Sequence, residues 1–249
     1  LFDLDGTLYS SSEDVRSWDE STGAWKRDPS DARGRMRLGS GTLIFDGNRV
    51  EFNGRSILPK PGRGGYRRFY YAHGHLCFYH TYWADQSGYR LHTTDDEGFS
   101  KLYACPWTPD EAGGVDLSRA TLITLPVVGE VPFSFGQLGD EVLTCSNIGG
   151  VYVFDGKSWR TAVEPEIDTS YQVYSMVNFY DRLLLAQYPT GLLFQYKGED
   201  VTLIEGWPPK MEGVSASVRE AQTTAIYGGD LFVGVWPWAE LWRYNSDTD

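Results

Sequence analysis

Large aromatic side chains and charged groups recur in segments rich in proline and glycine, where a folded chain has few places to bury them. Tyr188 and Trp207 each precede a proline, and Pro237 lies between Trp236 and Trp238. Aromatic rings stack on the apolar faces of sugars, while carboxylates and guanidinium groups hydrogen-bond hydroxyls or a uronate carboxylate. These residue types indicate a site for a carbohydrate or a similar polar ligand. The candidate ligand-binding residues are Arg67, Trp83, Asp85, Tyr188, Trp207, Arg219, Glu220, Trp236 and Trp238.

The same aromatic residues have a second use in a repeat protein. A tryptophan in a connecting segment can wedge between neighbouring repeats and be structural only, and one sequence does not show how exposed each loop is. Both interpretations stay open. No catalytic residue is assigned, so the pattern predicts binding and leaves processing of the ligand undecided.

The histidines form a second candidate group, because all of them lie between residues 73 and 92. Clustered imidazoles could bind a metal or act as acid and base. In the strands expected below, however, His73 and His75 fall in a turn, whereas His80 and His92 lie near later strands. We therefore expect them not to converge, and predict neither a metal nor another cofactor.

A repeated phrase predicts the elements that must position these residues. Residues 138–159 read as a tight polar turn, an apolar strand, a short loop, and a second strand that ends in an aromatic residue before Asp-Gly. The spacing of the later copies lies near the roughly 40–50 residues typical of a propeller blade. The apolar anchors of the first strand in the successive copies are Leu8, Leu76, Val142, Leu183 and Leu231.

The second strand of the phrase recurs with aromatic residues two positions apart or directly before Asp or Asn. This alternation is typical of a strand with one buried face. Its copies are residues 15–20, 43–47, 151–156, 192–198 and 240–245. The chain is therefore predicted to be all-β, a β-propeller of about five to seven four-stranded blades, some incomplete. We expect a single domain over 1–249, with blade pieces 1–30, 34–62, 66–108, 132–163, 172–206 and 222–249.

One segment supports this fold by resemblance. In residues 93–101, TTDDEGFSK, the positions of Thr94, Asp96, Gly98 and Ser100 resemble the Asp-box of sialidase-like propellers, although Lys101 stands where that family has Trp. The resemblance implies a structural turn between the third and fourth strands of a blade, away from the ligand site. No segment matches the N-terminal arginine motif of that family, so sialidase activity is not implied.

A competing resemblance lies at the start of the sequence. Residues 2–9, FDLDGTLY, resemble the first motif of haloacid dehalogenase phosphatases, in which Asp3 would be the nucleophile, Asp5 the general acid and base, and magnesium the cofactor. That family needs helices alternating with parallel strands, whereas this chain reads as all-β. The segment also fits the repeat, so we interpret the motif as a decoy and rank a phosphatase last.

Composition restricts the partners. The 34 acidic against 22 basic side chains give a net charge of −12, which disfavours nucleic acid and anionic membrane surfaces. Three cysteines without a CxxC pair indicate neither a zinc site nor a disulfide framework. There is no apolar run long enough to span a membrane. The compartment is left open, with an extracellular or periplasmic location favoured.

Together these patterns predict a carbohydrate-binding or carbohydrate-processing propeller. Its site is expected at the face where the loops between second and third strands meet the connections between blades, around the central channel. The alternative is a non-catalytic propeller whose aromatic loops bind another protein.

Overall fold

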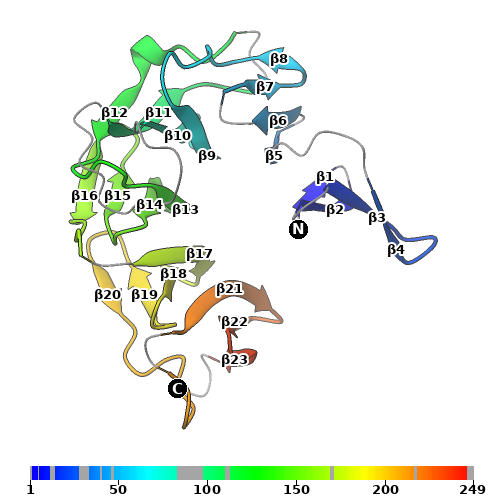
Figure 1. The fold of residues 1–249 in the computed structure, drawn as a ribbon, viewed down its shortest axis with the longest axis vertical. Coiled ribbons are helices and arrows are strands. Elements are labelled where there is room, and N and C mark those ends of the chain that lie inside the picture. The colour runs from blue at the N-terminus through cyan, green and yellow to red at the C-terminus, as the bar shows by residue number, and fades with distance from the viewer. Residues whose placement is uncertain are drawn as a thin grey trace. The chain divides into compact units, whose positions relative to one another are not determined.

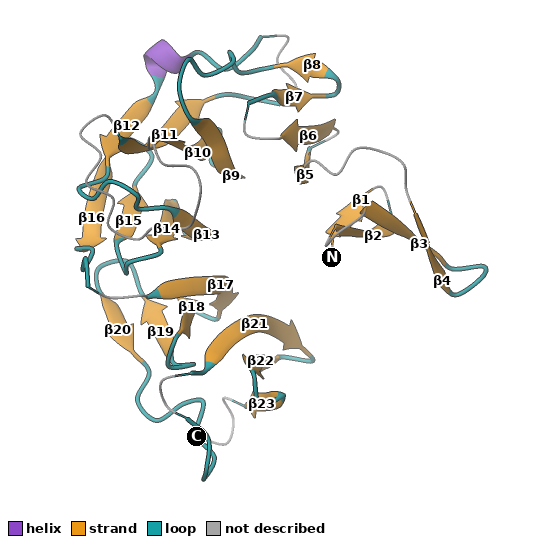
Figure 2. Cartoon of the chain, viewed as in Figure 1, coloured by secondary structure: helices purple, strands orange, loops and turns teal. Residues whose placement is uncertain are grey.

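A computed structural model describes residues 2–4, 6–11, 15–27, 34–39, 41–45, 48–82, 98–109, 113–168, 171–215 and 218–245. Strands dominate this part of the chain, and the helical element found in it is the short η1 (Leu117–Arg119) (Figure 2). Among the described residues, the strands form six antiparallel sheets, five of four strands and one of three. The prediction of an all-β propeller with some incomplete blades is confirmed.

The chain divides into two compact units. Unit 1 comprises Leu1–Gly62 and Trp107–Asp116, and unit 2 comprises Arg63–Pro106 and Leu117–Asp249. The expectation of one domain over 1–249 stays a prediction.

Unit 1 contains two of the sheets. Residues 107–116 belong to it, since the Trp107 ring lies 5.3 Å from that of Phe52 and the Val115 amide donates to the Ile57 carbonyl over 2.7 Å. Residues 43–47 were predicted as the second strand of the repeated phrase, which is the third strand of a sheet. Residues 43–45 lie instead in the second strand of their sheet, so that prediction was wrong. The strands are β1 (Phe2–Leu4), β2 (Thr7–Ser11), β3 (Val15–Asp19), β4 (Ala24–Arg27), β5 (Gly34–Leu38), β6 (Gly41–Phe45), β7 (Val50–Phe52) and β8 (Arg55–Ser56).

Unit 2 contains four sheets that follow one another along a curve, with β9, β13, β17 and β21 on its inner side (Figure 1). Each sheet is one blade, and its strands run outward in chain order. The strands are β9 (Gly65–Ala72), β10 (His75–Tyr82), β11 (Phe99–Pro106), β12 (Thr121–Thr124), β13 (Pro132–Leu138), β14 (Glu141–Ser146), β15 (Val151–Phe154), β16 (Trp159–Val163), β17 (Gln172–Phe179), β18 (Arg182–Tyr188), β19 (Leu193–Tyr196), β20 (Val201–Leu203), β21 (Glu220–Tyr227), β22 (Asp230–Trp236) and β23 (Glu240–Tyr244).

The core of unit 2 lies between consecutive sheets. The predicted anchors Leu76, Val142, Leu183 and Leu231 each occupy the second position of a second strand and are buried, whereas Leu8 in unit 1 is 38% exposed. Burial of each large aliphatic side chain stabilises the fold by about 1.5–3 kcal/mol. One cluster joins Leu143 and Val153 to Leu185 and Tyr196, and an equivalent cluster joins the next pair of sheets. The repeat therefore marks the apolar contacts between blades.

Strand pairing defines the two ends of unit 2. The first residues of β13, β17 and β21 pair with the last residues of β14, β18 and β22, as Glu220 does with Trp236. We call this the loop end, because the loops between second and third strands and the connections between sheets meet there. The opposite end, which carries tight turns such as the one at Gly139, is the turn end.

Candidate functional site

Three inner strands carry an extra residue at equivalent positions near the loop end. Phe133 in β13, Tyr174 in β17 and Gln222 in β21 each lie where the register of pairing with the next strand shifts by one. Such a β-bulge changes the direction of a side chain without breaking the rest of the ladder, and bulges are frequent beside binding sites. The bulges therefore single out this level of the inner strands.

The bulged tyrosine is the centre of an aromatic group. The Tyr174 ring lies 5.5 Å from that of Phe133 and 6.2 Å from that of Tyr188, both edge to face. Its hydroxyl donates to Gln172 Oε1 over 3.0 Å. Burial, together with the nearby Glu220 and Tyr188, raises the pKa of Tyr174, so the hydroxyl stays protonated. The ring is thus held between neighbours while part of it stays accessible.

A carboxylate and an aromatic loop residue lie next to this group. Glu220 is 9% exposed and accepts a hydrogen bond of 2.5 Å from Gln222 Nε2. Its strand partner Trp236 is 49% exposed and, with Gln222, borders an open depression of about 330 Å³. We define the loop-end cluster as Gln172, Tyr174, Tyr188, Glu220, Gln222 and Trp236.

Arg219 was predicted as a ligand-binding residue, but it is engaged inside the protein. The side chain is 2% exposed, and its Nη2 lies 2.7 Å from Glu240 Oε2 and 3.2 Å from the Pro209 carbonyl oxygen. Burial works to raise the pKa of Glu240, but hydrogen bonds from Arg219 and Trp242 outweigh it, and the pKa lies below its ordinary value. Arg219 therefore holds the entry of the last sheet in place.

A glycine permits this arrangement. Gly191, in the loop after β18, has a φ of +70°, and a Cβ at that position would lie 2.9 Å from the Cβ of Arg219. The Arg219 amide donates to the Pro189 carbonyl over 2.8 Å, which fastens the loop to the next sheet. An equivalent bridge joins Ile148 to Tyr171 one blade earlier. The loop end is thus built on a repeated backbone contact.

The other predicted residues do not join the cluster. Trp207 packs against Tyr244 with ring centres 5.3 Å apart, beside Phe179, so it wedges between two blades. Trp238 lies in the same loop as Trp236 and is 49% exposed. Arg67 lies in β9, two sheets away, with its Nε 3.1 Å from Thr81 Oγ1. Trp83 and Asp85 lie outside the described residues.

Three members of the cluster were missed in the sequence. Gln172, Tyr174 and Gln222 lie near the start of β17 and β21 and were not among the predicted ligand-binding residues. A signal exists, because Gln-x-Tyr at 172–174 and Glu-x-Gln at 220–222 place two polar side chains at the same point of consecutive repeats. The bulge that makes the second of each pair available is not visible in the sequence.

A further buried carboxyl lies at the loop end, in the connection that leads into β13. Glu130 is buried, and its Oε1 accepts a hydrogen bond of 2.7 Å from the Tyr152 hydroxyl. Burial raises the pKa of Glu130, and the nearby Glu164 acts in the same direction. This carboxyl belongs to the contact between two blades, not to the loop-end cluster.

The described histidines lie apart, as expected. His73 and His75 are at the turn end, where His73 Nε2 lies 2.8 Å from the Gly139 carbonyl oxygen, whereas His80 Nε2 lies 2.7 Å from that of Arg63 near the loop end. His92 lies outside the described residues. Each described histidine therefore has a local backbone partner.

The structure also describes parts of the two segments that resemble known families. In the Asp-box-like segment, the described residues 98–101 lead into and begin β11, the third strand of its sheet, whereas the resemblance implies a turn after the third strand; Thr94 and Asp96 lie outside the described residues. The phosphatase-like segment forms the antiparallel pair β1 and β2, in which Asp3 is opposite Leu8. Neither segment is in the place that its resemblance implies.

Comparison with known proteins supports the fold. No protein-family model matches the chain, and no curated protein does. The whole chain aligns with two crystal structures of the extracellular domain of BT4673 from B. thetaiotaomicron, named as a one component system in one and as a hybrid two component system in the other. The identities are 14% and 15%, and the TM-scores are 0.58 and 0.59. The chain spans about a third of those structures, since it covers 32% of each.

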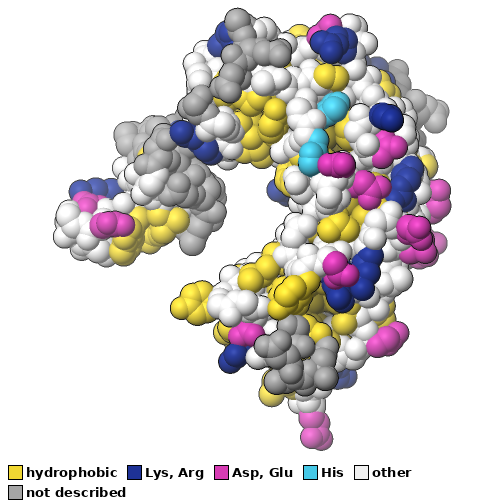
Figure 3. Space-filling model, turned by 180° about the vertical axis from the view of Figure 1, so that it is seen from behind, with side chains coloured by type: hydrophobic (Ala, Val, Ile, Leu, Met, Phe, Trp, Pro, Cys, Tyr) yellow, Lys and Arg dark blue, Asp and Glu magenta, His cyan; other side chains and the backbone are white. Residues whose placement is uncertain are grey.

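Charged side chains of both signs are interspersed over one face (Figure 3). Several of them form ion pairs, such as the pair in which Arg243 Nη2 lies 2.7 Å from Asp230 Oδ2. None of the described helical segments is long and apolar enough to cross a bilayer.

Proposed function

We propose that the loop end of unit 2 binds a carbohydrate, or another small ligand with a hydroxyl-rich surface. The observation that carries the proposal is the loop-end cluster, in which bulges place aromatic rings beside hydrogen-bonded amide and carboxylate groups. Tyr174, Tyr188 and Trp236 supply ring faces and edges for a sugar. Gln172, Glu220 and Gln222 supply donors and acceptors that are already oriented by their mutual hydrogen bonds.

The proposal is for binding and not for hydrolysis. Cleavage of a glycosidic bond ordinarily uses two carboxyl groups on opposite sides of the bond. Within the described residues the loop-end cluster holds one, Glu220, because the neighbouring Glu240 is buried in its pair with Arg219. A location outside the cytoplasm is part of the same proposal, and the extracellular domains of BT4673 with this fold are consistent with it.

The test is a glycan array followed by calorimetry with the oligosaccharide that binds best. Trp236→Ala and Glu220→Gln should each weaken binding by about tenfold, as expected for one stacking contact or one charged hydrogen bond. Tyr227→Ala is the matched control, since Tyr227 is an exposed aromatic residue at the turn end of the same sheet. Unchanged affinity in both site variants, with the melting temperature preserved, would refute the proposal.

A protein partner is the second candidate. The last sheet exposes Trp236, Trp238 and Leu241, the last of them 71% exposed. Exposed apolar groups of this kind are enriched in protein interfaces. A partner that excess oligosaccharide does not displace, together with an array that shows no binding, would favour this function.

A further inference from the structure

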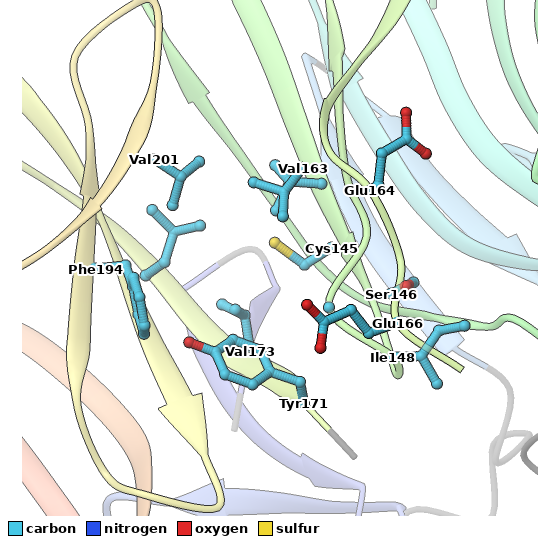
Figure 4. A pocket seen from close by; sticks show the side chains of 13 residues that line it. Cys145, Ser146, Ile148, Val163, Glu164, Glu166, Tyr171, Val173, Phe194 and Val201 are labelled. Carbon is cyan, nitrogen blue, oxygen red and sulfur yellow. The ribbon is translucent and has the colours of Figure 1, made fainter. Parts of the chain in front are cut away.

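A cavity of about 300 Å³ lies between the sheets β13–β16 and β17–β20 (Figure 4). Both sheets belong to unit 2, so the cavity is internal to one compact unit. None of the residues of the loop-end cluster lines this cavity. In β17, Val173 lines the cavity, whereas its neighbours Gln172 and Tyr174 belong to the cluster. Its volume is at the lower limit of ordinary ligand sites, which suits a small molecule.

Most of the lining is apolar. The Tyr171 and Phe194 rings meet edge to face with centres 5.7 Å apart and form one wall. Burial raises the pKa of the Cys145 thiol, which therefore stays uncharged inside the cavity. The aliphatic and sulfur-bearing part of the lining consists of Cys145, Ile148, Val151, Val163, Val173, Leu185 and Val201.

Two carboxylates border this apolar space. Glu164 and Glu166 lie on the other side of the cavity from Phe194 and Val201, and both are exposed (Figure 4). The Glu166 amide donates to the Ile148 carbonyl over 2.9 Å, which fixes the segment that carries them. No lysine or arginine is among the described residues that line the cavity.

This combination selects by charge as well as by shape. An apolar ligand body gains from leaving water, and aromatic rings and carboxylates both attract a cation at its end. An anion of the same shape would be repelled by both glutamates. A neutral molecule would gain from the apolar wall alone.

We propose that this cavity binds a small organic cation, an ammonium group on a short hydrocarbon or aryl-alkyl body. The body lies against Phe194, Val163 and Val201, and the ammonium group faces Glu164 and Glu166. The site is independent of the carbohydrate proposal, since it shares no residue with the loop-end cluster.

The test compares three probes by calorimetry on the full chain, which share a phenethyl group and differ in the terminal group: phenethylammonium, phenethyl alcohol and hydrocinnamate. The ammonium should bind most tightly, the alcohol more weakly and the carboxylate least. Glu164→Gln with Glu166→Gln should weaken the ammonium by roughly 2- to 30-fold, the sum of two exposed charge contacts, and leave the alcohol unchanged. Added salt should weaken only the ammonium.

Three further variants make the result specific. Glu199→Gln removes one negative charge from an exposed residue between β19 and β20 that does not line the cavity, and it should leave binding unchanged. Val201→Trp should fill the cavity and abolish binding of every probe, whereas Glu220→Gln should have no effect. Equal affinity for ammonium and alcohol, or equal losses in the Glu199 variant and the double variant, would overturn the proposal.

Discussion

The ion pair between Arg219 and Glu240 offers the sharpest test of the site as described. Replacing Arg219 by methionine leaves the Glu240 carboxylate buried, with Trp242 Nε1, 2.7 Å from Oε2, as its side-chain donor among the described residues. Removing one partner of a buried pair costs about 3–5 kcal/mol of unfolding free energy. In a unit of this size that corresponds to a fall in Tm on the order of 6–20 °C.

A double-mutant cycle with Arg219→Met and Glu240→Leu separates the pair from its surroundings. Because methionine and leucine fill similar space without a charge, the double variant should lose less stability than the two single losses together, by about 0.5–3 kcal/mol. Urea unfolding, followed by tryptophan fluorescence and circular dichroism, measures the free energy of unfolding of the native protein, the two single variants and the double variant. Additive losses would show that the two side chains do not stabilise each other.

The pair also predicts a pH dependence. The pKa of Glu240 is lower in the folded protein than its ordinary value of 4.5, so the ionised carboxylate favours the folded state. This contribution is complete above the ordinary pKa and is lost as the pH falls through the folded pKa. The stability difference between the native protein and Arg219→Met should therefore narrow on acidification. Full stability of Arg219→Met at neutral pH, with loss of oligosaccharide binding, would refute our reasoning and return Arg219 to the ligand site.

Two further outcomes follow from the loop end. Gly191→Ala should destabilise the protein by about 1–3 kcal/mol in urea unfolding, because the alanine Cβ would meet Arg219 at a positive φ, and it should cost more than Gly139→Ala, which has open space around its Cβ. Burial raises the pKa of Glu130, so folding favours the protonated form and the native protein should lose stability as the pH rises through that folded pKa. Glu130→Gln should lack this loss. A difference in unfolding free energy between the native protein and the variant that does not change with pH would contradict this prediction.

The fold could be predicted from the sequence because its repeat marks contacts that recur. Leu76, Val142, Leu183 and Leu231 are buried at the same position of successive second strands, so a local pattern was sufficient. Residues 43–47 misled because they share an aromatic-Asp-Gly ending with residues 151–156. Their strand is set instead by the hairpin that pairs Leu38 with Gly41.

The candidate site was only partly predictable, for a physical reason. Trp207 has its partner Tyr244 in another strand of another sheet, and no local pattern shows which way a long connection turns. Arg219 and Trp236 were both predicted as loop residues that bind a ligand. Arg219 is buried in an ion pair with Glu240, whereas Trp236 is half exposed. Tyr174 was missed because the sequence does not show that this residue of β17 has no partner in the next strand.

The bulges distinguish positions of the inner strands that can change without altering strand pairing from positions that cannot. Phe133, Tyr174 and Gln222 have no opposite residue in the ladder of the next strand, whereas their neighbours are tied to strand partners. Substitution at these positions therefore leaves the strand register intact. An aromatic, a phenolic and an amide side chain already occupy equivalent places in three successive repeats. Selection, or a designed library confined to these positions, can change ligand preference on a scaffold that stays the same.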